Sequence, residues 1–398
     1  MLIIEYRGVV SIMLKKFEVK NFKNFKENIV IDFSNIGGYQ FNTDCITDNL
    51  ISKMLIYGRN ATGKTNLGRA IMDIKFNLHN LFSDRILGKL NEILYINVDS
   101  DDNYAEFKYT FTFDDKELVY KYSKLSMTQL RDEELIIDGH MIFYYNFLDH
   151  KYNFDNLDYI EAESVITSRF LDSVKEIENA EDLDVRTLPF MRWLINNAAL
   201  AEYSILLKLD DYIRRMSILT VGSMVRTNRV SDNFFDTLKD PNKLKDFEEF
   251  LNFMGVECRL VLEKLPDGKS ELYFKHKELV PFYENDSSGT LALVDLYRKY
   301  FIGKTPSMMY LDEFDAFYHF EMAENLLKYF KIKFPNCQII LTSHNTNLIT
   351  NRIMRPDCLF ILSKSGQLTS LCNATNRELR EGHNLEKMYI SGEFDRYE

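Results

Sequence analysis

The sequence has few cysteines, and none is placed for a disulfide framework or a zinc site. Its 398 residues hold five of them, without any Cys-x-x-Cys pair: Cys45, Cys258, Cys337, Cys358 and Cys372. Small secreted domains and zinc modules need closely spaced cysteines. We therefore expect free thiols, a reducing compartment and no structural zinc.

The sequence also lacks a long hydrophobic run. No stretch reaches the roughly 18 apolar residues that suggest a membrane helix. Near the start, Glu5 and Arg7 interrupt an apolar stretch that has no basic leading region. We expect neither export nor a membrane span, and a cytoplasmic location. The recognisable pattern begins at Met13, so either Met1 or Met13 is the natural start.

An excess of positive charge is missing as well. The net charge is −11 and the isoelectric point is near 5.3, which argues against nucleic-acid binding over the whole surface. A local basic groove is still compatible with this composition. Hydrophobic residues make up 45% and charged residues 27%, as in folded proteins, and the length suits two structural regions.

A stretch near the start of the chain carries the strongest motif. The apolar run Leu55–Tyr57 enters a match to G-x-x-x-x-G-K-[ST], and residues 67–78 continue with apolar residues at helical spacing. Such a loop turns backbone N–H groups toward phosphates, its lysine reaches the β- and γ-phosphates, and its threonine ligates Mg²⁺. The sequence therefore predicts a site for ATP and Mg²⁺. The predicted loop residues are Gly58, Arg59, Asn60, Ala61, Thr62, Gly63, Lys64 and Thr65.

The regions around this loop alternate between strand and helix patterns. Residues 14–33 predict a basic hairpin and residues 104–147 a β-meander. For the hairpin lysines, a solvated strand face is favoured over a nucleic-acid contact. Residues 159–219 predict helices, too short and irregular in heptad phase for a coiled-coil arm. The candidate basic patch of this region is Arg214, Arg215, Arg226 and Arg229.

In the second half of the chain, polar residues lie where a predicted helix begins and where a predicted strand ends. Side chains at such positions can contact a bound nucleotide. Ser287, Ser288 and Gly289 open an amphipathic helix and offer N–H groups and hydroxyls to an anion, although a plain helix cap is the simpler interpretation of them alone. Residues 308–311 predict a buried strand that ends in Asp312 and Glu313. There, one carboxylate can hold Mg²⁺ and its neighbour can polarise a water.

A further strand is predicted at residues 338–341, and His344 lies just beyond it. Because open α/β sheets bind ligands at the carboxyl ends of their strands, we expect Asp312, Glu313 and His344 to meet near the γ-phosphate.

In this order, the motifs resemble the ABC-type ATPase heads of the RecF and SMC class. They are most similar to the overcoming-lysogenization-defect and abortive-infection ATPases of phage defence. The tail segments Gly382–Glu386 and Ser391–Phe394 add to the resemblance. A Q-loop glutamine is not placed, and the chain after His344 leaves no room for the Toprim nuclease of some relatives. The matches are Gly58–Thr65 to Walker A, Ser287–Thr290 to the signature motif, Leu311–Glu313 to Walker B, Asp315 to the D-loop and His344 to the switch histidine.

The resemblance implies an α/β P-loop NTPase head made of residues 1–157 and 236–398, with a helical insertion at 158–235. It also implies a homodimer closing on two ATP molecules, in which Ser287, Ser288 and Gly289 of one subunit cap the γ-phosphate held by Lys64 of the other. Many heads have glycine where Ser288 stands, so either serine is a candidate for facing the phosphate. In this scheme Glu313 is the general base, Asp312 and Thr65 hold Mg²⁺, and His344 stabilises transferred charge.

Different classes of function are compatible with these motifs. The first is an ATPase switch in antiviral defence that senses a phage product or nucleic acid and acts through a separate nuclease or toxin. The second is a RecF-like DNA clamp in repair or maintenance. A transporter subunit is a third, and it needs a membrane partner. The acidic net charge and the missing nuclease favour the first.

Overall fold

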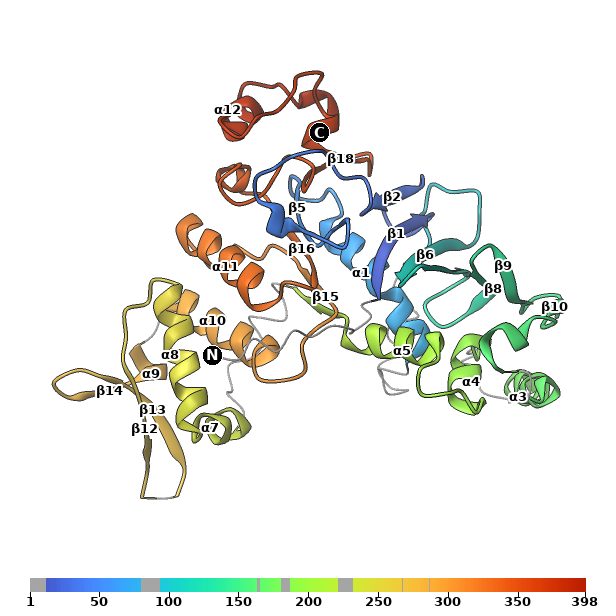
Figure 1. Ribbon diagram of the computed structural model, residues 1–398, viewed down its shortest axis with the longest axis horizontal. Coiled ribbons are helices and arrows are strands. Elements are labelled where there is room, and N and C mark those ends of the chain that lie inside the picture. Colours follow the sequence, from blue (N-terminus) through green and yellow to red (C-terminus); the bar gives the residue numbers. More distant parts are fainter. Residues whose placement is uncertain are drawn as a thin grey trace.

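The structure is a computed structural model that describes residues 12–79, 94–162, 165–179, 187–220, 232–266, 268–285 and 287–398. Figure 1 shows a central sheet with groups of elements around it. The antiparallel sheet of β1, β2 and β6 to β10 lies to one side with the helices α3 and α4, α7 to α10 with a small sheet lie to another, and α12 (Leu385–Ile390) lies on the third.

The central sheet carries the predicted motifs. Its strand order is β11-β15-β16-β5-β17-β18, and all neighbours are parallel except β17 and β18. Every residue of β5, β15 and β16 is buried, as expected for parallel strands covered on both faces. Figure 1 shows α1 (Lys64–Leu78) and α11 (Phe320–Lys333) on either side of this sheet. The strands are β5 (Lys53–Tyr57), β11 (Ser217–Leu219), β15 (Met308–Leu311), β16 (Gln338–Ser343), β17 (Leu359–Leu362) and β18 (Leu368–Ser370).

The second sheet is antiparallel, in the order β10-β9-β8-β7-β6-β1-β2. It confirms the predicted hairpin and the predicted β-meander. Alternate side chains of β6 and β7 are buried, which explains the period of two in the sequence. Its strands are β1 (Met13–Lys20), β2 (Ile29–Asp32), β6 (Ala105–Phe113), β7 (Lys116–Lys124), β8 (Leu130–Ile137), β9 (His140–Asn146) and β10 (Tyr152–Asn153). A separate short pair is β3 (Ile46–Thr47) with β4 (Leu50–Ile51).

The predicted helical region is partly helical. It contains α3 (Thr167–Asn179), α4 (Phe190–Asn197) and α5 (Ile205–Arg215). The prediction that the helix continues to Leu219 is wrong, because Ser217–Leu219 form β11 at the edge of the central sheet. There, the three residues gain ladder hydrogen bonds to β15, which stabilise a strand too short to show a period in sequence. The range 158–235 therefore includes a strand of the central sheet.

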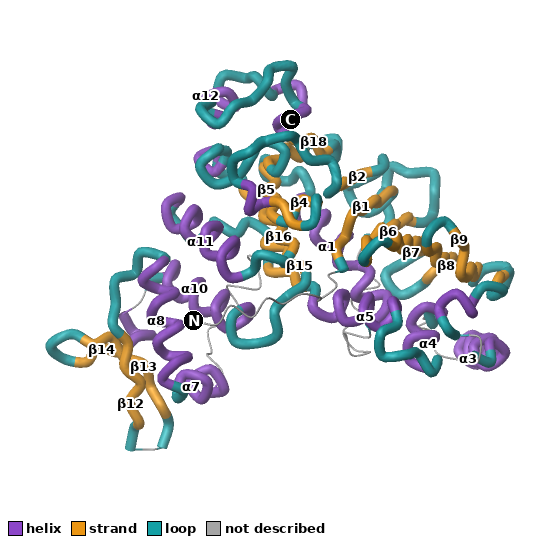
Figure 2. Tube along the Cα trace, viewed as in Figure 1, coloured by secondary structure: helices purple, strands orange, loops and turns teal. Residues whose placement is uncertain are grey.

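The remaining elements form the group at the lower left of Figure 2, where helices lie beside a small sheet. In this sheet β13 pairs antiparallel with both β12 and β14. Aromatic rings join these helices, with the centroids of Phe247 and Tyr297 separated by 4.7 Å. The elements are α7 (Asp232–Leu238), α8 (Pro241–Phe253), α9 (Phe282–Asn285), α10 (Ser288–Tyr300), β12 (Leu260–Lys264), β13 (Ser270–Lys275) and β14 (Leu279–Pro281).

Two general features of the chain bear on the sequence predictions. All five cysteines are free thiols. Among the described residues, no helix is long and apolar enough to cross a membrane.

Candidate nucleotide-binding site

The predicted phosphate loop lies between the end of β5 and the start of α1. Gly63 has φ of +102°, which favours glycine, and a Cβ there would lie 2.3 Å from Asn24 Nδ2. Ala61 is also left-handed, with φ of +66°. This curled backbone, followed directly by a helix N-terminus, has the form of an anion cradle.

Asn24, which the sequence analysis did not single out, braces this loop from the turn between β1 and β2. Its side-chain amide donates to the Thr62 carbonyl at 3.3 Å, and it accepts from the Asn66 amide at 2.7 Å. The only sequence signal was a polar residue in a turn, about 40 positions before the loop, and no motif connects the two.

Lys64 is nearly enclosed, with 4% of its side chain exposed. Its ammonium group donates to the carbonyl oxygens of Gly58 at 2.7 Å and Arg59 at 3.2 Å, and it lies 3.7 Å from Glu313 Oε1. Burial lowers the pKa of Lys64, while the neighbouring carboxylates of Glu313 and Asp312 oppose that shift. The Lys64 amine thus lies directly over the loop.

Thr65 and Asp312 form the oxygen-rich corner where a metal ion is predicted. The Thr65 hydroxyl donates to Asp312 Oδ2 at 2.5 Å, and the Thr342 hydroxyl donates to Oδ1 at 2.9 Å. Asp312 is buried at the end of β15, so its orientation is fixed. Hydroxyl and carboxylate oxygens are ligands that Mg²⁺ accepts, and this pair fits such an ion together with the phosphates.

Glu313 is turned toward the same corner by an unusual backbone. Its φ is +46°, in the left-handed region, and its amide donates to the Thr342 hydroxyl at 2.8 Å. The carboxylate is 32% exposed, so water can reach it. A carboxylate between the loop lysine and solvent has the placement that a general base needs.

Asp315 and His344 lie at the same edge of the central sheet. The Ser343 hydroxyl donates to Asp315 Oδ2 at 2.9 Å, while Oδ1 is buried and has no hydrogen-bond partner among the described residues. Burial raises the pKa of Asp315. His344 follows the last residue of β16 and is exposed. The structure therefore places Lys64 and the acidic residues together, with His344 beside them on the neighbouring strand.

The predicted signature residues lie elsewhere, at the start of α10. The Ser287 hydroxyl accepts from the Thr290 amide at 3.2 Å and lies 3.0 Å from the Thr290 hydroxyl. Ser287 and Ser288 are exposed. A Cβ on Gly289 would lie 2.9 Å from the Phe317 carbonyl oxygen, so this helix starts close against the segment after Asp315. Among the described residues, the hydrogen bonds of Ser287 stay within its own helix.

Arg59 and the C-terminal segment meet at the other side of the loop. The exposed Arg59 guanidinium forms an ion pair with the Glu398 side chain, and the rings of Tyr57 and Tyr389 are 4.7 Å apart. Asn60, between Arg59 and Ala61, is exposed. The part of the C-terminal segment that contains Tyr389 and Glu398 thus lies beside the phosphate loop.

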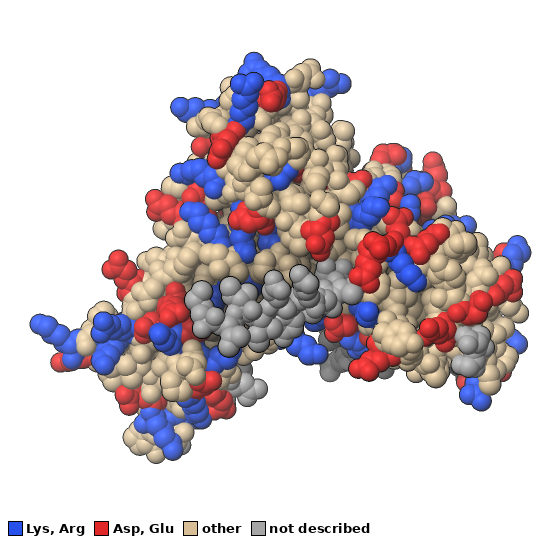
Figure 3. All heavy atoms as spheres, in the orientation of Figure 1, with Lys and Arg blue, Asp and Glu red and all other residues tan. Residues whose placement is uncertain are grey.

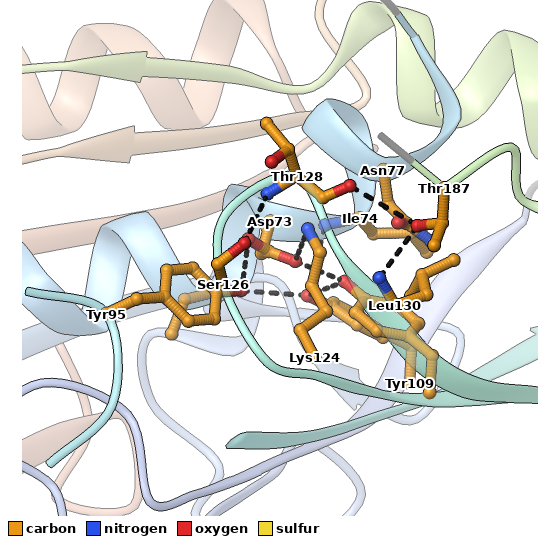
Figure 4. A network of polar contacts seen from close by, with 12 residues as sticks. Asp73, Ile74, Asn77, Tyr95, Tyr109, Lys124, Ser126, Thr128, Leu130 and Thr187 are labelled. Carbon is orange, nitrogen blue, oxygen red and sulfur yellow. Dashed lines mark hydrogen bonds and ion pairs between the residues drawn. The ribbon is translucent and has the colours of Figure 1, made fainter. Parts of the chain in front are cut away.

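A buried polar network, which the sequence analysis missed, holds α1 against the meander (Figure 4). Asp73 of α1 accepts from Tyr95 at 2.8 Å and from Lys124 at 2.9 Å, and Tyr122 also donates to it at 2.9 Å. The Tyr109 hydroxyl donates to the Ala70 carbonyl at 2.8 Å. The tyrosines of these strands are buried, and their hydroxyl groups add fixed hydrogen bonds to the helix behind the phosphate loop.

A second branch of this network reaches α4. The Asn77 amide donates to the Tyr120 hydroxyl at 3.0 Å, which donates to Glu133 at 2.8 Å. Glu133 also accepts from the backbone amides of Phe190 and Met191 in the first turn of α4. Burial raises the pKa of Glu133 to about 7.

A strand leads through a glycine-containing loop into a helix, a lysine lies over the loop, and a carboxylate follows the end of β15. This arrangement defines a P-loop NTPase. Residues 53–350 match the family described as "AAA domain, putative AbiEii toxin, Type IV TA system". The match covers most of the chain, and the chain belongs to this family. The protein is therefore a P-loop NTPase domain of the AAA type, related to abortive-infection families, and the predicted α/β P-loop fold class is confirmed.

Solved structures similar to this chain include SMC heads, whereas no curated protein matches it. The SMC head domain from Thermotoga maritima has a TM-score of 0.45 and 15% identity, over 90% of this chain and 98% of that one. An SMC head bound to the C-terminal winged-helix domain of ScpA has the same score and identity, with 97% of its chain covered. An SMC head with an extended coiled coil, bound to the C-terminal domain of ScpA derived from Pyrococcus furiosus, has a TM-score of 0.42 and 15% identity.

Proposed function

We propose that this chain is a switch that binds and hydrolyses ATP with Mg²⁺. The observation that carries the proposal is the pairing of both Walker motifs in one corner, with Thr65 2.5 Å from Asp312 and Lys64 3.7 Å from Glu313. Lys64 would neutralise the β- and γ-phosphates, and Thr65 with Asp312 would hold the ion. Glu313 would orient and deprotonate the attacking water, and His344 would stabilise the charge on the transferred phosphoryl group.

We further propose that the site is completed in a homodimer. Ser287 and Ser288 are exposed at a helix N-terminus, where N–H groups are free to bind a phosphate. They form no hydrogen bond to the phosphate loop among the described residues. A second chain, facing the first, would bring these groups and Gly289 to the γ-phosphate on Lys64.

The cellular role that we propose is antiphage defence of the abortive-infection type, acting through a separate effector. Membership of a family named for an AbiEii toxin supports this role. The RecF-like clamp finds less support, because acidic and basic side chains alternate over the face shown in Figure 3. Lys15 and Lys20 of the hairpin lie against Glu117 and Asp102, and Arg214 pairs with Asp210. Arg226 and Arg229 lie outside the described residues.

Phosphate release from ATP by the purified protein tests the enzymatic proposal. We expect Mg²⁺-dependent turnover in the wild type and a loss of about 100-fold or more in Lys64→Ala, because the loop lysine carries the charge that neutralises the phosphates. Lys75→Ala is the matched control, since Lys75 lies on the same helix but donates to the carbonyls of Arg214 and Met216. Equal turnover in wild type and Lys64→Ala would contradict the proposal.

Phage plating on cells that carry the gene with its neighbours tests the cellular role. We expect protection that disappears in Lys64→Ala and depends on a neighbouring nuclease or toxin gene. The clamp alternative predicts instead ATP-dependent DNA binding that weakens steeply as salt is raised. Absence of DNA binding at low salt with ATP present would exclude that alternative.

A further inference from the structure

Tyr310 of β15 touches the first turn of the phosphate-loop helix. Its side chain is fully buried, two positions before Asp312, and its hydroxyl donates to the Lys64 backbone carbonyl at 2.5 Å. Its ring fills the space beside Gly68, where a Cβ would lie 2.4 Å from Tyr310 Cε1. The helix can therefore approach the strand this closely only because residue 68 has no side chain.

Among the described residues, two hydrogen bonds join the Walker A helix to the Walker B segment. One is the Tyr310 bond to the Lys64 carbonyl, and the other is the Thr65 bond to Asp312. The second involves two side chains that would hold Mg²⁺, so its length would depend on whether the ion is bound. The first uses atoms outside the metal corner and can persist.

We propose, on the basis of the function proposed above, that Tyr310 is a positioning residue that keeps α1 and β15 aligned, so that Thr65 and Asp312 stay at a spacing that suits Mg²⁺. It acts through the Lys64 backbone and contacts neither phosphate nor metal. Gly68 on the helix leaves the space that the Tyr310 ring occupies. Small displacements of reacting groups lower rates strongly, so a hydroxyl that fixes this spacing affects turnover more than nucleotide binding.

The test is Tyr310→Phe, which keeps the ring and removes the hydroxyl. We expect kcat to fall about 10-fold and the Mg²⁺ concentration for half-maximal turnover to rise about threefold to 10-fold. Affinity for ATP measured without Mg²⁺ should change less than about twofold, since the loop amides and the Lys64 side chain are untouched. A purely structural role for Tyr310 would leave the Mg²⁺ requirement unchanged.

Tyr212→Phe is the matched control. Tyr212 is also a buried tyrosine, and its hydroxyl donates to Gln338 Oε1 at 2.7 Å, at the end of β16 away from the predicted site. The substitution and the type of bond lost are the same, so the stability cost should be similar. We expect its Mg²⁺ dependence to match that of the wild type, and thermal melting to show that both variants are folded.

Gly68→Ala gives an independent route to the same change, because its methyl group would displace the Tyr310 ring and hydroxyl. It should raise the Mg²⁺ requirement in the same direction. A wild-type Mg²⁺ dependence in Tyr310→Phe, or an equal shift in Tyr212→Phe, would overturn the inference while an active wild type upholds the proposed function. A wild type without ATP turnover would overturn both.

Discussion

The two predicted halves of the nucleotide site are built in different ways. The phosphate-loop half is enclosed and bonded together: Lys64 is 4% exposed, and Thr65 is hydrogen-bonded to Asp312. The signature half is open, with Ser287 and Ser288 exposed and the Ser287 hydroxyl used to cap its own helix.

This difference indicates which contacts one chain can form by itself. Packing of β5, β15 and α1 fixes the phosphate and metal end of the site, because the buried side chains there are held by their neighbours. The signature groups face outward, where only another molecule can reach them. We infer that nucleotide binding depends on one chain and that turnover depends on a second.

The largest change is expected when the buried Asp73 network, which supports the phosphate-loop half, is disrupted. Asp73→Asn should lower the free energy of unfolding by about 3–5 kcal/mol, because it leaves the buried Lys124 ammonium without its counter-charge. Urea denaturation measures the change. Asp73→Asn combined with Lys124→Met should recover part of the loss, and Asp114→Asn in an exposed turn is the control. A change below about 1 kcal/mol would show that the network does not hold α1.

The next prediction concerns a substitution that disrupts the signature half and leaves the phosphate-loop half intact. Ser288→Arg should keep ATP affinity within about twofold but lower turnover about 100-fold, because a long cation fills the gap that a partner's phosphate would enter. Ser173→Arg on α3 is the control, since its hydroxyl bonds only within its own helix among the described contacts. Undiminished hydrolysis in Ser288→Arg would refute completion of the site by a second chain.

The smallest effect concerns the branch of the network that reaches α4. Burial raises the pKa of Glu133 from 4.5 to about 7, so the folded protein binds this proton more tightly than the unfolded chain. The stability that Glu133 contributes is therefore largest below pH 4.5 and falls as pH rises to about 7. Between pH 5 and 7.5 we expect the wild type to lose about 2 kcal/mol relative to Glu133→Gln. Parallel stability curves for the two proteins would contradict this.

Most of the enclosed half could be predicted from the sequence. The loop, β5, β15, β16 and their polar ends follow from buried apolar runs that stop at characteristic residues. Asn24 and Tyr310 could not be found in this way. Their role depends on which turn and which helix lie beside them, and a tyrosine in an apolar strand has the same pattern whether or not its hydroxyl has a partner.

Short elements and distant contacts account for the wrong or missing predictions. Ser217–Leu219 were expected to be helical because the apolar spacing of the preceding helix continues to Ile218, whereas pairing with the neighbouring β15 decides their conformation. The Asp73 network joins α1 to strands about 20 to 50 residues away, so no local spacing reveals it.

The solution mass of Glu313→Gln, with and without ATP and Mg²⁺, tests the central claim most directly. Removing the predicted base should leave nucleotide binding intact and trap the closed state, because hydrolysis no longer separates the chains. We predict a monomer that becomes a dimer only when ATP and Mg²⁺ are both present, and that stays a monomer when Lys64→Ala is added. A mass that does not respond to ATP would contradict the account.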